Sequence, residues 1–184
     1  MIWKPCVFLA ASALLLVLSR ASLLHPRSHG FWRFFAWEAI VALSLLHVDR
    51  WFATPFAWHQ LVSWALLALC CVPVVWGTVL LRRQGRQARE RAGDPTLLAF
   101  ERTTVLVTSG VYRYIRHPLY TSLLLLAWGI FFKGPSWMGG SLSAAATAFL
   151  VATALADEAE CRRFFGPEYA TYMRRTTRFI PFVV

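Results

Sequence analysis

The stretch that decides the fold is Leu106–Tyr120, LVTSGVYRYIRHPLY, where two arginines, a histidine and three tyrosines precede a strongly apolar run. Polar groups at membrane depth are energetically costly, so a dense set of them indicates a bound polar ligand. Pro118 directly follows His117 and suits the first turn of a helix, where its missing N–H is not needed. The backbone N–H groups of Leu119 and Tyr120 would then point out of the helix start, which favours an anionic group there.

The chain around this stretch is too apolar for an ordinary soluble domain. Of its 184 residues, 58% are hydrophobic and 15% are charged, whereas soluble domains are about 45–50% apolar. No fixed-period repeat, low-complexity tract or hydrophilic linker divides it, so we expect one integral-membrane domain over residues 1–184. The four cysteines lack CxxC or Cys/His ligand spacing, so we expect neither disulfides nor a metal site.

Five apolar segments approach the length of about 20 residues that crosses a bilayer. They cover about 5–24, 34–51, a part of 51–81, 118–132 and 137–156. The fourth segment is short, about 15 residues or roughly 22 Å, so its start should lie below the headgroups, in a polar pocket open to both water and lipid. A cleaved signal peptide is the weaker interpretation of the first segment, because Lys4 is a poor n-region and Arg20 interrupts the cleavage zone.

The tail after Ala156 alternates apolar and charged residues at helical spacing and is interrupted at Gly166 and Pro167. This pattern predicts two short amphipathic pieces at the membrane interface. The expected fold class is therefore all-α: a polytopic membrane protein with about five transmembrane helices and a C-terminal amphipathic interfacial helix.

The basic residues predict the orientation of the spans. In a five-span topology one face has three arginines before residue 34, eight between Arg82 and Arg116 and five after Ala156, while the other has only Lys4, Arg50 and Lys133. The positive-inside rule then places the arginine-rich loop and the C-terminus in the cytoplasm and the N-terminus outside, with a bacterial inner membrane as the expected location. This topology explains the net charge of +10 better than nucleic-acid binding does. The composition of residues 82–103 is more typical of a solvated cytoplasmic loop than of a surface patch that binds lipid headgroups.

Two segments resemble the isoprenylcysteine carboxyl methyltransferase family. The segment Thr104–Tyr120, TVLVTSGVYRYIRHPLY, resembles its donor-binding segment, and residues 157–181, DEAECRRFFGPEYATYMRRTTRFIP, resemble its pattern of paired acids, Phe-Gly, Tyr and a closing Ile-Pro. The resemblance implies a membrane enzyme that moves a methyl group from S-adenosylmethionine to a lipid-like or small hydrophobic acceptor. Three apolar spans in 1–81 would precede a cofactor-binding core in 82–184.

The resemblance also implies a set of cofactor-binding residues. Carried over by position, they are Thr104, Val105, Leu106, Val107, Tyr112, His117, Pro118, Leu119, Tyr120, Asp157 and Glu158. A carboxylate at the end of the last span would accept hydrogen bonds from the cofactor and oppose its sulfonium charge, and no metal is needed because a sulfonium is already an activated leaving group. From the residues alone, the two acids could instead solvate a helix end and pair with Arg162 or Arg163.

The acceptor is less well specified than the cofactor. The RHPxY core is shared with membrane phospholipid N-methyltransferases. The family's eukaryotic carboxyl methyltransferases carry an arginine four residues before the paired acids, and Thr153 stands there in this chain. Arg113, Arg116 and Glu158 are therefore only candidates for a catalytic role. The alternatives are a phospholipid or small-molecule N- or S-methyltransferase and a non-catalytic membrane protein of the same fold.

Overall fold

The computed structural model describes residues 3–85 and 103–182. Within these residues the chain is all-helical and has no β-strand, which confirms the expected fold class. The α-helices are α1 (Trp3–Leu23), α2 (His29–His47), α3 (Trp58–Gln84), α4 (Pro118–Phe131), α5 (Trp137–Phe165) and α6 (Pro167–Met173). Two short 3-10 helices, η1 (Val48–Arg50) and η4 (Gly110–Arg113), complete the described structure.

The apolar helices correspond to the five expected spans. Four stretches are long and apolar enough to cross a membrane: α1, α2 continued through η1, α3 and α5. Helix α4 has only 14 residues, so the fourth span is as short as the sequence predicts. The second span begins earlier than expected, at His29 rather than near residue 34, because Ser28 caps the helix by accepting a hydrogen bond from the Phe31 N–H.

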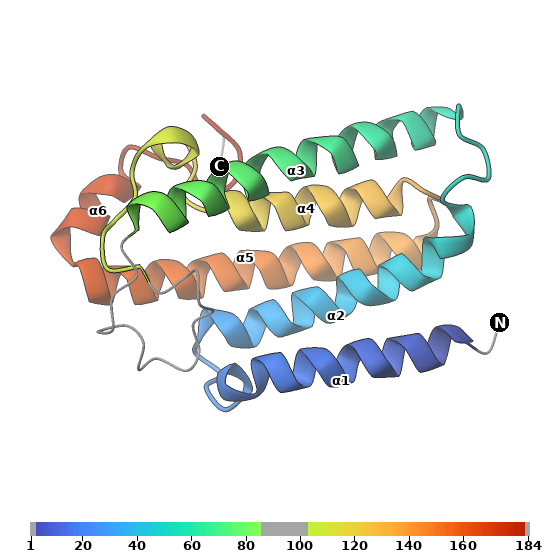
Figure 1. Ribbon diagram of the computed structural model, residues 1–184, viewed down its shortest axis with the longest axis horizontal. Helices are drawn as coiled ribbons and strands as arrows, with labels where there is room; N and C mark the ends of the chain where they lie inside the picture. The colour runs from blue at the N-terminus through green and yellow to red at the C-terminus, as the bar shows by residue number, and fades with distance from the viewer. Residues whose placement is uncertain (1–2, 86–102, 183–184) are drawn as a thin grey trace.

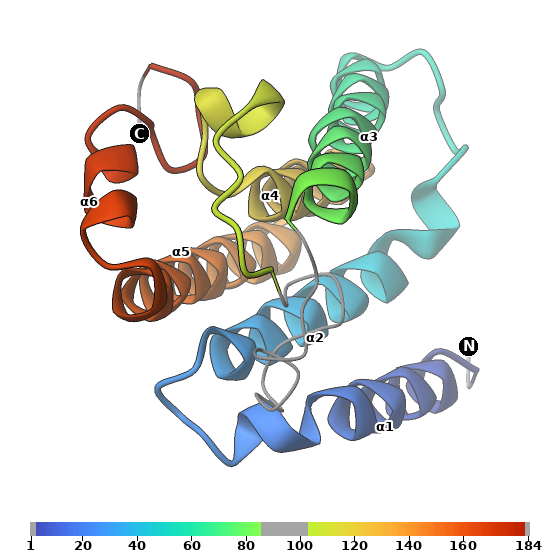
Figure 2. The ribbon, with the colours of Figure 1, turned by 60° about the vertical axis from the view of Figure 1, so that its left-hand side comes forward.

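The five apolar helices lie side by side along the long axis of the molecule (Figure 1). Helix α2 packs against α1 and α5, and α4 packs against α5 and α3. The start of α1 lies at one end of the bundle. The opposite end collects the last turns of α3 and α5, the first turn of α4, and α6, and the turned view shows the same grouping (Figure 2).

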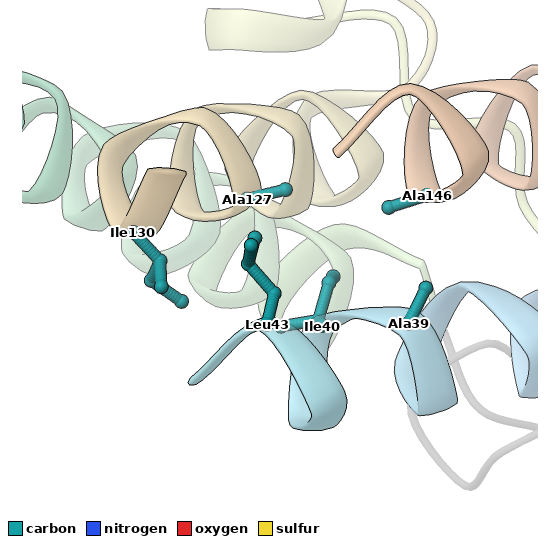
Figure 3. Packing of buried hydrophobic residues seen from close by; sticks show 6 residues of the cluster. All are labelled: Ala39, Ile40, Leu43, Ala127, Ile130 and Ala146. Carbon is teal, nitrogen blue, oxygen red and sulfur yellow. The ribbon is translucent and has the colours of Figure 1, made fainter. Parts of the chain in front are cut away.

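The centre of the bundle is built from small and branched side chains. Figure 3 shows its core, in which α2 contributes Ala39, Ile40 and Leu43, α4 contributes Ala127 and Ile130, and α5 contributes Ala146. Alanines at the crossing points let the helix backbones approach closely, as small residues do in membrane bundles.

Helix α5 is longer than the sequence predicts. The expected fifth span ends near Ala156, whereas the helix continues to Phe165 and ends at Gly166, which has φ of +61°. A positive φ suits glycine, and α6 begins at the next residue, Pro167. The first of the two expected amphipathic pieces is thus the continuation of α5. Asp157 and Glu158 lie inside this helix rather than at its end, because partners from other segments neutralise their charge.

The arginine-rich loop is described only at its edges. Arg82 and Arg83 form the last turn of α3, and Thr103 begins the next described segment. Most of the loop predicted for residues 82–103 lies outside the described residues.

Candidate active site

A pocket opens at the end of the bundle where α3 and α5 finish and α4 begins. It holds about 770 Å³ of space, open solvent at its mouth included. Its lining residues come from α3, the segment before α4, α4 itself, α5 and α6. They are Leu81, Thr103, Leu106, Val107, Tyr112, Arg116, His117, Pro118, Leu119, Tyr120, Asp157, Cys161, Phe165, Tyr169 and Tyr172.

The backbone before α4 is held by the C-terminal segment. Ile115 and Thr177 form a parallel bridge. The Arg116 N–H donates to the Thr177 carbonyl over 2.9 Å, and the His117 N–H donates to the Arg178 carbonyl over 3.2 Å. Helix α4 then starts at Pro118, as predicted. The imidazole of His117 is thereby held at the pocket wall by two segments that are far apart in sequence.

The His117 side chain lies between two carboxylates of α5. Its Nδ1 is 3.4 Å from Oδ2 of Asp157, and its Nε2 is 3.3 Å from Oε1 of Glu158. The ring stacks on Tyr120 with centroids 5.3 Å apart. Burial alone would lower the pKa of His117, but the hydrogen bonds and negative charges of Asp157 and Glu158 outweigh it, so the pKa is raised and the imidazolium form is favoured.

Glu158 is the centre of a buried charge network. It is 4% exposed. Its Oε1 accepts from Arg116 Nε at 2.9 Å and from Arg178 Nε at 3.0 Å, and its Oε2 accepts from Arg178 Nη2 at 2.9 Å. Arg116 also donates through Nη1 to the carbonyls of Met173 and Thr176. Glu158 is not among the pocket-lining residues, so this carboxylate holds basic side chains instead of facing the pocket.

Asp157 is the carboxylate that faces the pocket. Its Oδ2 accepts from the Tyr120 hydroxyl at 3.4 Å, and its Oδ1 accepts from the Cys161 thiol at 3.5 Å. Its side chain is 26% exposed. Its Oδ2 is also 3.4 Å from Nδ1 of His117, so this carboxylate pairs with the imidazole and, at the pocket wall, can also face a cationic ligand.

A comparison with known proteins identifies the family to which this chain belongs. The family model described as phospholipid methyltransferase matches residues 58–168, more than half of the chain. This chain belongs to the phospholipid methyltransferase family. No curated protein and no solved structure matches it.

This family and the isoprenylcysteine carboxyl methyltransferases are kin, so the match supports a membrane methyltransferase without singling out the isoprenylcysteine branch. Members of the family generally use S-adenosylmethionine. The matched region runs from the start of α3 to the start of α6 and contains both His117 and Asp157. The chain is accordingly a membrane methyltransferase, and all the described pocket-lining residues except Tyr169 and Tyr172 lie in the matched region.

The pocket brings together most of the residues that the sequence indicates. The predicted residues that line it are Leu106, Val107, Tyr112, His117, Pro118, Leu119, Tyr120 and Asp157, and Arg116 joins them. Thr104, Val105 and Glu158 do not line it: the backbone N–H groups of Thr104 and Val105 donate to the Gly85 carbonyl, over 3.0 and 3.3 Å. Arg113 lies in an adjoining hollow, which shares Leu106 and Tyr172 with the pocket and is also lined by Glu168 and Arg175.

Six further lining residues are missed by the sequence reasoning. They are Leu81, Thr103, Cys161, Phe165, Tyr169 and Tyr172. Cys161 and Phe165 follow Asp157 at intervals of four residues, so a longer fifth helix would have placed all three on one face. Tyr169 and Tyr172 reach the pocket only because Gly166 turns α6 back toward it, and no local pattern signals that contact.

Proposed function

We propose that this membrane methyltransferase binds S-adenosylmethionine in the pocket between His117 and Tyr169 and transfers its methyl group to an amphiphilic lipid acceptor. The observation that carries this proposal is the position of Asp157. It is the one carboxylate among the described lining residues. Its Oδ2 accepts from the Tyr120 hydroxyl, and Tyr169 and Tyr172 line the same pocket. A carboxylate beside aromatic faces complements a sulfonium cation, by direct attraction and by cation–π contact.

The position of the pocket in the bundle would give both a water-soluble reactant and a lipid reactant access to it. Helix α4 has 14 residues, which corresponds to about 21 Å against a hydrocarbon core of about 30 Å. Its first turn, at His117 and Pro118, would therefore lie below the headgroups on one side of the membrane. A water-soluble donor would enter from the cytosol and a lipid acceptor from the bilayer.

The chain's own residues would position the reactants. When bound, S-adenosylmethionine supplies a methyl group on a sulfonium that leaves as a neutral thioether. Asp157 would oppose the positive charge of the donor, while the Arg116–Glu158–Arg178 network holds the pocket wall in place. Alignment of two reactants in one site can supply about 7–11 kcal/mol of the activation barrier.

The surroundings of the pocket favour an amine over a carboxylate as the acceptor group. A carboxylate needs a basic side chain with free hydrogen-bond donors. Arg116 lines the pocket, but its Nε and Nη1 are engaged by Glu158 and two backbone carbonyls, which leaves only Nη2 for a substrate carboxylate. Thr153 is fully buried and its hydroxyl donates to the Phe149 carbonyl. Asp157, by contrast, could accept a hydrogen bond from an acceptor amine, whose ammonium form would lose its proton to solvent before the nitrogen attacks the methyl group. A phospholipid amine therefore ranks first, and an isoprenylcysteine carboxylate is the alternative.

The test is a methylation assay with purified protein in lipid nanodiscs and radiolabelled methyl donor. We expect label in phosphatidylethanolamine and little in N-acetyl farnesylcysteine. Asp157→Asn should abolish the labelling, whereas Glu168→Gln, which changes an exposed acid of the other hollow, should not. Preferential labelling of farnesylcysteine would favour the alternative, and no labelling of either would reject both acceptors.

A further inference from the structure

Two tyrosines of α6 line the same pocket but differ in their hydroxyl groups. Tyr169 is 3% exposed and Tyr172 is 8% exposed. The Tyr172 hydroxyl donates to the Tyr112 carbonyl over 2.7 Å. The Tyr169 hydroxyl has no hydrogen-bond partner among the residues that the structure describes. This hydroxyl is not one of the fully buried polar atoms without a partner, so it keeps access to the open space of the pocket, where a ligand can supply the missing partner.

The Tyr169 ring is held firmly in its place. It stacks on Phe165 with centroids 6.4 Å apart and planes 23° apart, and it packs against Tyr172 at 5.7 Å. Gly166, with its positive φ, and Pro167 at the first position of α6 set the direction of that helix. The hydroxyl is therefore presented to the pocket by a rigid ring, with little entropy left to lose when a ligand binds.

The protonation state of Tyr169 limits what its hydroxyl can do. Burial raises the pKa of this phenol far above its usual value, and the nearby groups Cys161, Asp157 and Glu158 raise it further. The side chain stays neutral at physiological pH. It is consequently a hydrogen-bond donor and not a proton-accepting base.

We infer that Tyr169 is a further cofactor-binding residue, whose hydroxyl donates a hydrogen bond to an oxygen or nitrogen atom of bound S-adenosylmethionine. This inference rests on the proposed function. S-adenosylmethionine has carboxylate, ribose and adenine atoms that can accept this hydrogen bond. Tyr169 also lies beside Asp157 and Cys161 along the pocket wall, next to the carboxylate assigned to the sulfonium.

The two tyrosines provide a matched pair of variants that separates ligand binding from folding. Tyr169→Phe removes a hydroxyl with no partner in the protein, so the ligand-free melting temperature should not change. Isothermal titration with S-adenosylmethionine should then show a loss of affinity of about 3- to 10-fold, the value of one neutral hydrogen bond. Tyr172→Phe removes a hydroxyl that bonds to Tyr112, so it should lower the ligand-free melting temperature by about 2–4 °C.

Tyr114→Phe serves as a neutral control, because this side chain is exposed and lies outside the pocket. Wild-type affinity in Tyr169→Phe would overturn the inference and leave the proposed function standing. A drop in the ligand-free melting temperature of Tyr169→Phe equal to that of Tyr172→Phe would also overturn it, because the hydroxyl would then have a structural role. Absence of any S-adenosylmethionine binding by the unmodified protein would overturn the proposed function together with this inference.

Discussion

Arg178 holds both carboxylate oxygens of Glu158, with Nε 3.0 Å from Oε1 and Nη2 2.9 Å from Oε2. Glu158 belongs to α5, whereas Arg178 lies beyond α6, in the segment that pairs with the backbone of Arg116 and His117. This bidentate ion pair therefore connects the C-terminal segment to α5 at the pocket wall.

Arg178→Ala should destabilise the protein. The substitution removes two charge-assisted hydrogen bonds from a buried carboxylate, a loss of about 1.5–3 kcal/mol, which corresponds to a decrease of about 4–10 °C in melting temperature for a chain of this length. Arg163→Ala is the control, since Arg163 is exposed and bonds only to the Ala159 carbonyl of its own helix. Thermal unfolding in detergent measures both. Equal melting temperatures for the two variants would contradict the assigned role of Arg178.

The raised pKa of His117 predicts a pH dependence of stability. Because the folded protein binds this proton more tightly than the unfolded chain, the stabilisation is complete below about pH 6.5, the unfolded value, and is lost as the pH rises through the folded pKa. The melting temperature of the unmodified protein should decrease over this alkaline range more steeply than that of His117→Gln. Parallel curves for the two proteins would show that the imidazolium does not stabilise the fold.

Two substitutions of Tyr120 should separate the packing role of its ring from the role of its hydroxyl in ligand binding. Its ring belongs to the core cluster with Leu150 and Phe179, while its hydroxyl reaches Asp157 at 3.4 Å. Tyr120→Phe removes one long hydrogen bond, so it should lower the melting temperature by no more than about 2 °C and weaken donor affinity by a few fold. Tyr120→Ala should cost about 3–5 kcal/mol of stability through lost packing. A Tyr120→Phe variant with the same melting temperature as Tyr120→Ala would contradict this division.

His117→Ala should also be destabilising, since the imidazole lies between two carboxylates.

The orientation of the spans remains a prediction. Reporter fusions should place Thr96 and Val184, which lie outside the described residues, in the cytoplasm and Ser136 on the other side. Ser136 caps the start of α5, at the end of the bundle opposite the pocket (Figure 1). A periplasmic signal at Val184 would reverse the topology and put the pocket on the wrong side for a cytosolic donor.

Much of the fold was predictable because it depends on local signals. Lengths of apolar runs, the position of Pro118 and the break at Gly166 place most helices within a few residues. The end of α5 was not predictable in this way. Charges at 157–163 resemble a helix end, but Arg116, His117 and Arg178 compensate them from distant parts of the chain.

Contacts between distant parts of the chain also limit how much of the site the sequence predicts. His117 and Asp157 could be found because each lies in a recognisable motif. The different roles of the neighbouring acids could not, because one helical step turns Asp157 toward the pocket and Glu158 toward the two arginines. The contribution of α6 depends on a turn whose direction only tertiary packing decides.

The most direct test of the central claim is calorimetric titration of the detergent-solubilised protein with S-adenosylmethionine. We predict saturable binding at one site, a loss of affinity of about tenfold or more in Asp157→Asn because a charged partner of the sulfonium is removed, and unchanged affinity in Glu168→Gln. No saturable binding to the unmodified protein, or equal affinity in Asp157→Asn, would contradict the claim that this pocket holds the methyl donor.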